Sequence, residues 1–261
     1  MHTPSIFSTG LRQVVLAAAA LTAVVPAGLA LASPMDWVAG ERVQGSGNIK
    51  KVSRELAHFT GVGLSLPATV ELRIGNTESI TIETDDNLLP LIDTVIENGV
   101  LKVRPAKKNM NLQTRTMKIV IQARTIDSIA LGGSGSIESD ALRGANMEFV
   151  LGGSGSISVK GVDAESVKIT VGGSGNFKSG SGVIDRLAVS IGGSGDVDAG
   201  QLKAREASVS VAGSGEATVW ASDTLSMRVA GSGDVNYYGD PKLSKSVAGS
   251  GSAKRLGAAP R

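Results

Sequence analysis

The sequence contains no cysteine, only 3% aromatic residues and no long apolar run after its first 32 positions. Without cysteine, the chain forms neither a disulfide framework nor a thiol nucleophile, and it carries no diacyl lipid anchor. The mature chain also lacks the roughly 20 apolar residues that a membrane helix needs. Acidic and basic residues are interspersed along the sequence, and 26 basic and 24 acidic residues give a net charge of +2. This pattern argues against a nucleic-acid-binding protein.

The N-terminus has the build of an export signal. Arg12 precedes an uninterrupted apolar run from Val14 to Val25, and a small-residue zone ends at Ala30-Leu31-Ala32. A short positive region, an apolar stretch and an A-x-A site define a secretory signal peptide. We therefore expect residues 1–32 to be removed, with cleavage after Ala27 as the alternative. The mature protein would be exported to the periplasm or the cell surface of a bacterium.

A glycine–serine–glycine step recurs at a fixed interval through the second half of the chain. The spacing is 20 residues for four steps and 18 for the last two. The serines of the repeat are Ser134, Ser154, Ser174, Ser194, Ser214, Ser232 and Ser250. Apolar residues precede each serine by three positions and, except for Lys245, by five, and Thr170, Ser190 and Ser210 lie between the two apolar columns. This period of two indicates strands rather than helices.

Each repeat therefore predicts a strand, a glycine corner and a second short strand. No repeat can bury its apolar side alone, whereas stacked repeats form a continuous core. A step of 18–20 residues suits one coil of a β-solenoid and is too short for a propeller blade. Glycine at the corners lets neighbouring coils approach closely, and the serine column could form a hydroxyl ladder. Near the end, Lys245 enters an apolar column and Tyr237-Tyr238 precedes Pro241, which indicates a terminal cap.

The first half lacks the repeat but still reads as strands. We expect these at Gly61–Leu66, Thr69–Ile74, Ser79–Glu83, Val100–Arg104 and Lys118–Gln122. Asn98-Gly99 is a strong hairpin-turn signal, and Asp85–Pro90 reads as a turn or a single helical coil. Residues 107–115 read as a polar loop. This half is predicted to consist of irregular coils that merge into the regular array.

The expected organisation is one continuous all-β domain behind the signal peptide. The predicted segments are a signal peptide at 1–32, a lead-in with an isolated GSG copy at 33–52, an irregular half at 53–125, regular coils at 126–255 and a disordered tail at 256–261.

The order of these segments resembles a known family. It runs RELAHFTGVGLSLPATVELRIGN (54–76), ITIETDDNLLPLI (80–92), ENGVLKVR (97–104) and TMKIVIQARTIDSIALGGSGSI (116–137), followed by the repeats. This is similar to the head GIN domain of bacterial autotransporter-type adhesins, over roughly residues 45–255. The resemblance implies a right-handed, single-stranded parallel β-helix-like fold, export to the cell envelope and no established enzymatic activity. The chain departs from an autotransporter because no membrane β-barrel segment follows the head.

The glycine motif does not carry the chemistry of a phosphate loop or a serine nucleophile. A phosphate loop needs a lysine and a helix after its glycines, and here a strand follows. A nucleophile elbow needs a histidine base, and His58 is the sole histidine of the mature chain. Serine hydrolysis and His/Cys metal binding are therefore excluded, and no cofactor is expected.

Acidic residues form the more serious candidate site. Two positions after the corner serine, three consecutive coils carry Asp196, Glu216 and Asp234. Stacked about 4.8 Å apart, they could be a solvated edge, a Ca²⁺ site, or the acids of a polysaccharide lyase or hydrolase.

Aromatic residues give the last candidate. Trp220, Tyr237 and Tyr238 are close in sequence and could form either a platform for a sugar or peptide, or the packing of the cap.

The leading hypothesis is an exported, non-catalytic β-solenoid that acts as a cell-envelope interaction or adhesion module. Its partner would be an envelope protein, a glycan or a second copy of the chain. The alternative is a carbohydrate-active β-helix enzyme that uses the three acids.

Overall fold

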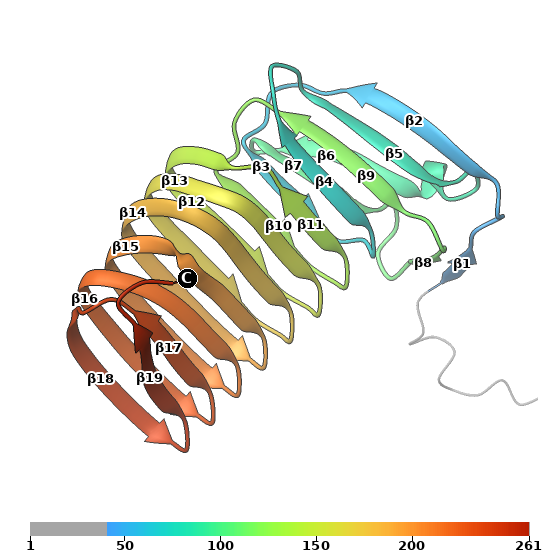
Figure 1. Ribbon diagram of the computed structural model, residues 1–261. Coiled ribbons are helices and arrows are strands. Elements are labelled where there is room, and N and C mark those ends of the chain that lie inside the picture. The colour runs from blue at the N-terminus through green and yellow to red at the C-terminus, as the bar shows by residue number, and fades with distance from the viewer. Residues whose placement is uncertain (1–40, 261) are drawn as a thin grey trace, which may run out of the picture. The chain divides into compact units, whose positions relative to one another are not determined.

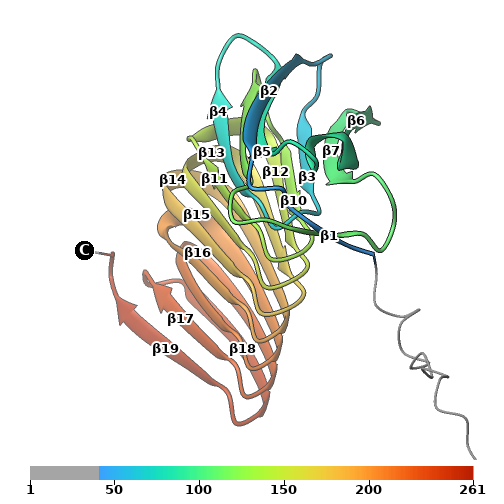
Figure 2. The same ribbon diagram turned by 90° about the vertical axis from the view of Figure 1, so that its right-hand side faces the viewer.

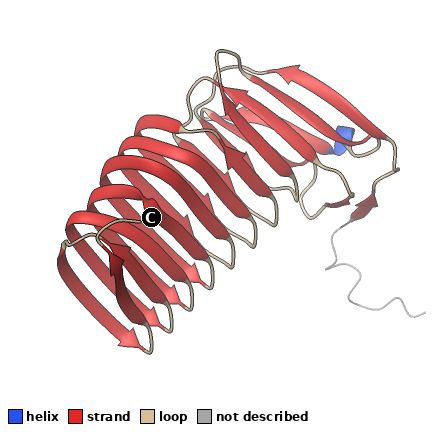
Figure 3. Ribbon diagram, viewed as in Figure 1, coloured by secondary structure: helices blue, strands red, loops and turns tan. Residues whose placement is uncertain are grey.

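The computed structural model describes residues 41–260 of the chain (Figure 1). This part is built almost wholly from β-strands (Figure 3). Its helical content is the 3-10 turn η1 (Leu89–Leu91), at the turn expected around Asp85–Pro90. The expected signal peptide, residues 1–32, lies outside the described residues.

The strands of the first half are β1 (Arg42–Gln44), β2 (Ile49–Glu55), β3 (Gly61–Leu64), β4 (Thr69–Ile74), β5 (Ser79–Asp85), β6 (Ile92–Glu97), β7 (Val100–Pro105), β8 (Asn111–Gln113) and β9 (Lys118–Ala123). Those of the second half are β10 (Ser128–Leu131), β11 (Ser136–Ser139), β12 (Leu142–Leu151), β13 (Ser156–Val171), β14 (Asn176–Gly193), β15 (Asp196–Gly213), β16 (Glu216–Gly231), β17 (Asp234–Tyr238), β18 (Lys242–Gly249) and β19 (Ser252–Gly257).

The second half is a stack of parallel coils, which Figure 2 shows from the side. Each strand pairs in register with the chain one repeat further on: Ile169 aligns with Val189, and Val189 with Val209. Where the repeat shortens to 18 residues, Val209 aligns with Met227. The predicted parallel β-solenoid with coils of about 20 residues is confirmed.

Alternate residues of each coil point into one apolar core. Ile169, Val171 and Phe177 are all buried, and they occupy the columns identified in the sequence. Phe149 and Phe177 contact each other with ring centroids 4.9 Å apart and a tilt of 50°. Tilted aromatic pairs of this kind add to the stabilisation that burial supplies. Because neighbouring coils share these columns, no coil has a complete core of its own.

The corners hold the coils together through the backbone. The amide of Ser154 donates a hydrogen bond to the carbonyl oxygen of Gly133, at 3.0 Å, and later corners repeat this bond. A Cβ added to Gly153 would lie 2.3 Å from the same oxygen, so only glycine allows this approach. In the described part of the chain, no hydrogen bond joins one corner hydroxyl to the next. The ladder is therefore made by backbone amides, and not by serine hydroxyls as expected.

The first half departs from a simple series of coils. The coil β3–β4 lies between the coil β7–β9 and the coil β10–β11, because β3 pairs with both β7 and β10, and β4 with both β9 and β11. Strands β2 and β9 flank β5, and both are antiparallel to it. The predicted hairpin is confirmed: β6 and β7 are antiparallel, and Asn98 and Gly99 have φ angles of 53° and 75°.

Residues 107–115 differ from the expected polar loop. Within them, β8 pairs in parallel with β1. Met110 and Leu112 are buried, so these two apolar side chains dock a segment that is otherwise polar. Their spacing of two residues is the strand period, which the surrounding lysine and asparagine residues obscure.

The last coil consists of β18 and β19 and is mostly exposed. Lys245 aligns with the buried Met227, and Leu243 aligns with the buried Leu225 but is 46% exposed. Within residues 41–260, no strand pairs with the outer edge of this coil. The charge of Lys245 therefore lies at an exposed sheet edge, where it opposes the addition of a further strand. Strand β19 continues to Gly257 and so enters the segment expected to be a disordered tail.

Candidate functional site

The three acidic residues follow one another at the start of consecutive coils, and the carboxylate of each accepts a hydrogen bond from the next coil. Asp196 accepts a hydrogen bond from the amide of Glu216 at 3.1 Å. Glu216 accepts from the side-chain amide of Asn236. Asp234 accepts from both the amide and the hydroxyl of Ser252, at 2.9 and 2.7 Å, and the hydroxyl bond is the main cause that lowers the pKa of Asp234. The column therefore works as a set of cross-coil hydrogen bonds.

This arrangement offers little to the catalytic or cation-binding alternatives. A lyase or hydrolase needs one acid whose pKa is raised beside another that stays ionised. The pKa of Asp234 is instead lowered, so this carboxylate is held in its charged form. Across the described residues, no group of three or more His, Cys, Asp or Glu side chains is placed to hold a metal ion. His58 lies far along the chain from the column and is hydrogen-bonded to Glu78 at 2.6 Å.

The aromatic residues are only partly brought together. Trp220 aligns with Tyr238 in the next coil, and both lie on the outward side of the sheet. Tyr237 instead aligns with the buried Val219 and packs against the core, so it cannot belong to the same platform. The ammonium of Lys203 lies 5.5 Å from the centre of the Trp220 ring, a cation–π contact.

One outward row runs along the solenoid through these residues. Val183 aligns with Lys203, Lys203 with Trp220, and Trp220 with Tyr238. We call these four residues the aromatic row. Val183 is 68% exposed, the largest value among the exposed large apolar side chains of the described chain. The row thus presents apolar and cationic surface on four successive coils.

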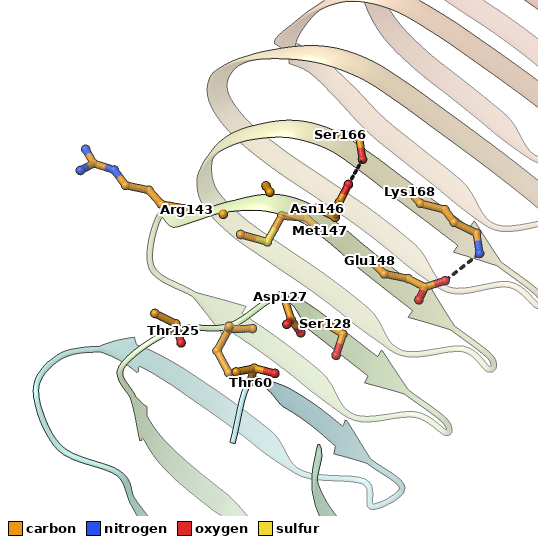
Figure 4. Close-up of a pocket in the computed structure, with 13 residues that line it drawn as sticks. Thr60, Thr125, Asp127, Ser128, Arg143, Asn146, Met147, Glu148, Ser166 and Lys168 are labelled. Atoms are coloured by element: carbon orange, nitrogen blue, oxygen red, sulfur yellow. Dashed lines mark hydrogen bonds and ion pairs between the residues drawn. The ribbon is translucent and has the colours of Figure 1, made fainter. Parts of the chain in front are cut away.

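A groove that the sequence did not indicate lies where the first half meets the regular coils. It has a volume of about 740 Å³ and opens between β12 and the segment that precedes β10 (Figure 4). It is lined by Thr60, Thr125, Ile126, Asp127, Ser128, Arg143, Gly144, Ala145, Asn146, Met147, Glu148, Ser166 and Lys168. The rim is polar, with Ser166 donating to Asn146 at 2.8 Å and Lys168 to Glu148 at 2.7 Å.

The isolated GSG copy also has a role that the sequence did not reveal. The amide of Gly47 donates to Asp85 at 2.6 Å, and the hydroxyl of Ser46 donates to Asp86 at 2.6 Å. The hydroxyl of Thr114 donates to Asp85 as well. The bond from Thr114 first, and then that from Gly47, lower the pKa of the buried Asp85 carboxyl, and the bond from Ser46 lowers the pKa of Asp86. We call Ser46, Gly47, Asp85, Asp86 and Thr114 the clasp, since they join three distant segments of the first half.

Comparison with known proteins gives the family. A family model described as "Putative auto-transporter adhesin, head GIN domain" matches residues 58–241. The chain belongs to this family. A search of curated proteins finds no match.

Solved structures share the fold of this head GIN domain. The crystal structure of a "putative adhesin" from Bacteroides fragilis is 22% identical, with a TM-score of 0.76, over 82% of this chain and 100% of that one. A "putative lipid binding protein" from Parabacteroides distasonis is 26% identical, with a TM-score of 0.68, over 83% and 100% of the two chains. A "putative adhesin" from Parabacteroides merdae is 17% identical, with a TM-score of 0.65, over 83% and 99%.

Some of the features described above lie inside the residues that the family model matches, and others lie outside them. The groove and the aromatic row fall inside residues 58–241, while Ser46 and Gly47 of the clasp and the whole of the last coil fall outside. In residues 41–260, no helix is long and apolar enough to cross a membrane. Both candidate binding surfaces, the groove and the aromatic row, thus lie in the part of the chain that the family model matches.

Proposed function

We propose that this head GIN domain is an exported, non-catalytic interaction module that attaches to a component of the bacterial cell envelope. The aromatic row is the observation that carries the proposal. Its four side chains are held one coil apart on a stacked sheet, so a repetitive ligand meets a preorganised surface. Large aromatic side chains with an adjacent cation are typical of contact residues in binding sites.

Two further observations support an adhesive rather than an enzymatic role. The acids that would serve a polysaccharide enzyme are occupied by hydrogen bonds from the next coil. The family description and the names of similar structures refer to adhesins, and one refers to lipid binding. Export would follow from the N-terminal signal at residues 1–32, and the ligand would be an envelope protein, a glycan or a lipid headgroup.

Binding to envelope fragments tests this proposal. Fragments from the bacterium that expresses the protein would be immobilised, and the purified protein applied at increasing concentration. We expect saturable binding that weakens at least tenfold when Trp220 and Tyr238 are both replaced by alanine. Val150→Ala, which trims an exposed apolar residue on another face, is the matched control and should bind as the parent does. Absence of saturable binding by the parent protein would refute the proposal.

The same assay separates the ligand classes. Equal binding to protein-free lipid vesicles would assign the ligand to the lipid, and loss of binding after protease treatment of the fragments would assign it to an envelope protein. Binding that survives protease treatment and is absent from protein-free vesicles would leave the glycan as the ligand.

A further inference from the structure

The groove beside β12 lies where one side of a coil is missing. Ser139 and Ile121 both align with Leu72, and Glu148 aligns with Ser128. Residues 140–147 connect Ser139 to Glu148 on one side of the groove. On the other side, only residues 122–127 connect Ile121 to Ser128. The next coil again uses eight residues, 160–167, and pairs closely with β12. The shorter link also rises by two coils, because the coil β3–β4 lies between β9 and β10. Strand β4 leads into the antiparallel β5, so part of one row of the sheet is missing.

The missing row leaves a strand edge open inside the solenoid. Residues 142–146 pair with β13 on one side, and among the described residues they pair with no strand on the other. The gap is closed at both ends by backbone hydrogen bonds, from Asp140 to Leu72 at 3.0 Å and from Glu148 to Asp127 at 2.8 Å. Unlike the edges at the two ends of the stack, this edge is flanked by coils on both sides. A strand entering here would continue an existing sheet.

The side chains around the gap suit an extended polypeptide. Gly144 and Ala145 place no long side chain on the open edge, so another backbone can approach it. Met147 and Ile126 are both buried and give the groove an apolar floor that can receive one side chain. In Figure 4, Met147 points into the space between β12 and the segment at Thr125–Ser128. No aromatic side chain lines the groove to stack on a sugar ring.

The rim adds charge at its two ends. Arg143 is largely exposed, and its closest acidic group, Asp163, is 3.8 Å away. Asp127, at the end nearer to Glu148, makes no ion pair within the described part of the chain. A segment with an acidic residue toward Arg143 and a basic residue toward Asp127 would satisfy both charges.

We propose that this groove binds an extended segment of a partner protein, about six residues long, by adding it as a strand to the open edge of β12. Main-chain hydrogen bonds would supply affinity, and the apolar floor and the two charges would supply selectivity. This inference rests on the proposed function and names a protein as one partner of the module. It concerns a surface separate from the aromatic row.

A library of linear peptides tests the proposal. Peptides would be selected on the immobilised parent protein, and their affinity then measured on Ala145→Lys, because a lysine on an exposed edge prevents strand addition. Selected peptides should bind the parent protein and lose at least tenfold in affinity on Ala145→Lys. Ala212→Lys is the matched control, since Ala212 is exposed, is paired on both sides and aligns with no residue of the groove. It should bind within about threefold of the parent, as expected for a distant surface change.

Two measurements identify the mode of binding. Amide hydrogen exchange in residues 142–147 should slow on adding the peptide, and N-methylation of the peptide backbone should weaken binding at least tenfold. The proposal is overturned if no peptide is selected on the parent protein, or if the selected peptides bind Ala145→Lys and parent alike. Envelope binding is measured on the same variants. If no peptide is selected and Ala145→Lys still binds envelope fragments, the groove proposal fails and the adhesive function stands. If peptides bind the groove but the parent protein does not bind envelope fragments, the adhesive function fails and the groove proposal stands.

Discussion

Gly213 lies directly against Gly193 of the preceding coil, with a φ angle of +139°. A Cβ on Gly213 would be 2.2 Å from the Gly193 carbonyl oxygen, the same oxygen that accepts a hydrogen bond from the amide of Ser214 at 2.9 Å. The corner glycine is thus required both by the backbone angle and by the distance between coils.

Gly213→Ala should therefore destabilise the protein by about 1–3 kcal/mol, because alanine is strained at this φ and its methyl group collides with a carbonyl. Gly192→Ala is the matched control. A Cβ there meets nothing within 4 Å, and the next coil already has alanine at the aligned position, Ala212. Urea unfolding should place this control within about 0.5 kcal/mol of the parent. Equal losses from the two substitutions would show that glycine acts at the corner only through chain flexibility.

The regular coils are predictable because every repeat has the same pattern of apolar columns around a glycine–serine–glycine corner. Seven corners define the period, and the apolar columns by themselves identify Ile169, Val171 and Phe177 as core residues. The first half has no such redundancy. Local signals locate its strands, but nothing in the sequence tells that Gly61–Leu64 lies between two coils formed later in the chain. Such order depends on long-range packing.

The binding surfaces are predictable only in part. The sequence points to the outward aromatic pair, Trp220 and Tyr238. Tyr237 does not belong with them, because neighbouring residues of a strand point to opposite faces. The groove arises because β4 leads into β5 and the link at residues 122–127 rises by two coils, which is visible only once the register of the neighbouring coils is known. The clasp joins Ser46 to Asp86 across 40 positions, and neither segment signals the other.

Phe177 tests the shared core. It is buried and contacts Phe149 in the preceding part of the stack. Phe177→Ala should cost about 3–5 kcal/mol, since the cavity removes contacts from two coils. Phe177→Leu should cost about 1.5 kcal/mol or less, because most of the volume is kept. Val183→Ala, at a position that is 68% exposed, serves as the control and should change the unfolding midpoint little. A loss below about 1 kcal/mol for Phe177→Ala would mean that the coils do not share one core.

The clasp predicts how stability depends on pH. The pKa of Asp85 is lowered in the folded protein, by the Thr114 hydroxyl first and then by the Gly47 amide. Its contribution is therefore fully present above the pKa of a free aspartate, about 3.9, and is lost as the pH falls through the lower folded value. Unfolding free energy measured from pH 6 to pH 2 should fall less steeply for Asp85→Asn than for the parent.

Thr114→Val sharpens this test, because it removes the largest cause of the shift. Its loss of stability on acidification should be smaller than the parent's and should be complete at a higher pH, because the folded pKa of Asp85 then lies closer to its free value. Asp163→Asn, which changes an exposed carboxylate outside the clasp, should leave the pH profile unchanged. Parallel profiles for the parent and Asp85→Asn would show that Asp85 is not held in its charged form by the fold.

The acidic column gives a prediction about calcium. Because Asp196, Glu216 and Asp234 accept hydrogen bonds from the next coil, we expect thermal unfolding to be the same in excess Ca²⁺ and in chelator, within about 1 °C. A cation bound at 100 times its Kd would stabilise the fold by about 2.7 kcal/mol and raise the Tm by roughly 5–10 °C, so the two cases are well separated. Asp234→Asn keeps an oxygen that can accept from Ser252, whereas Asp234→Ala does not. The asparagine variant should therefore be the more stable of the two in either buffer. A rise in Tm with Ca²⁺ that both variants abolish would instead make the column a cation site, because a cation needs the charge of Asp234 while the hydrogen bonds need only an acceptor.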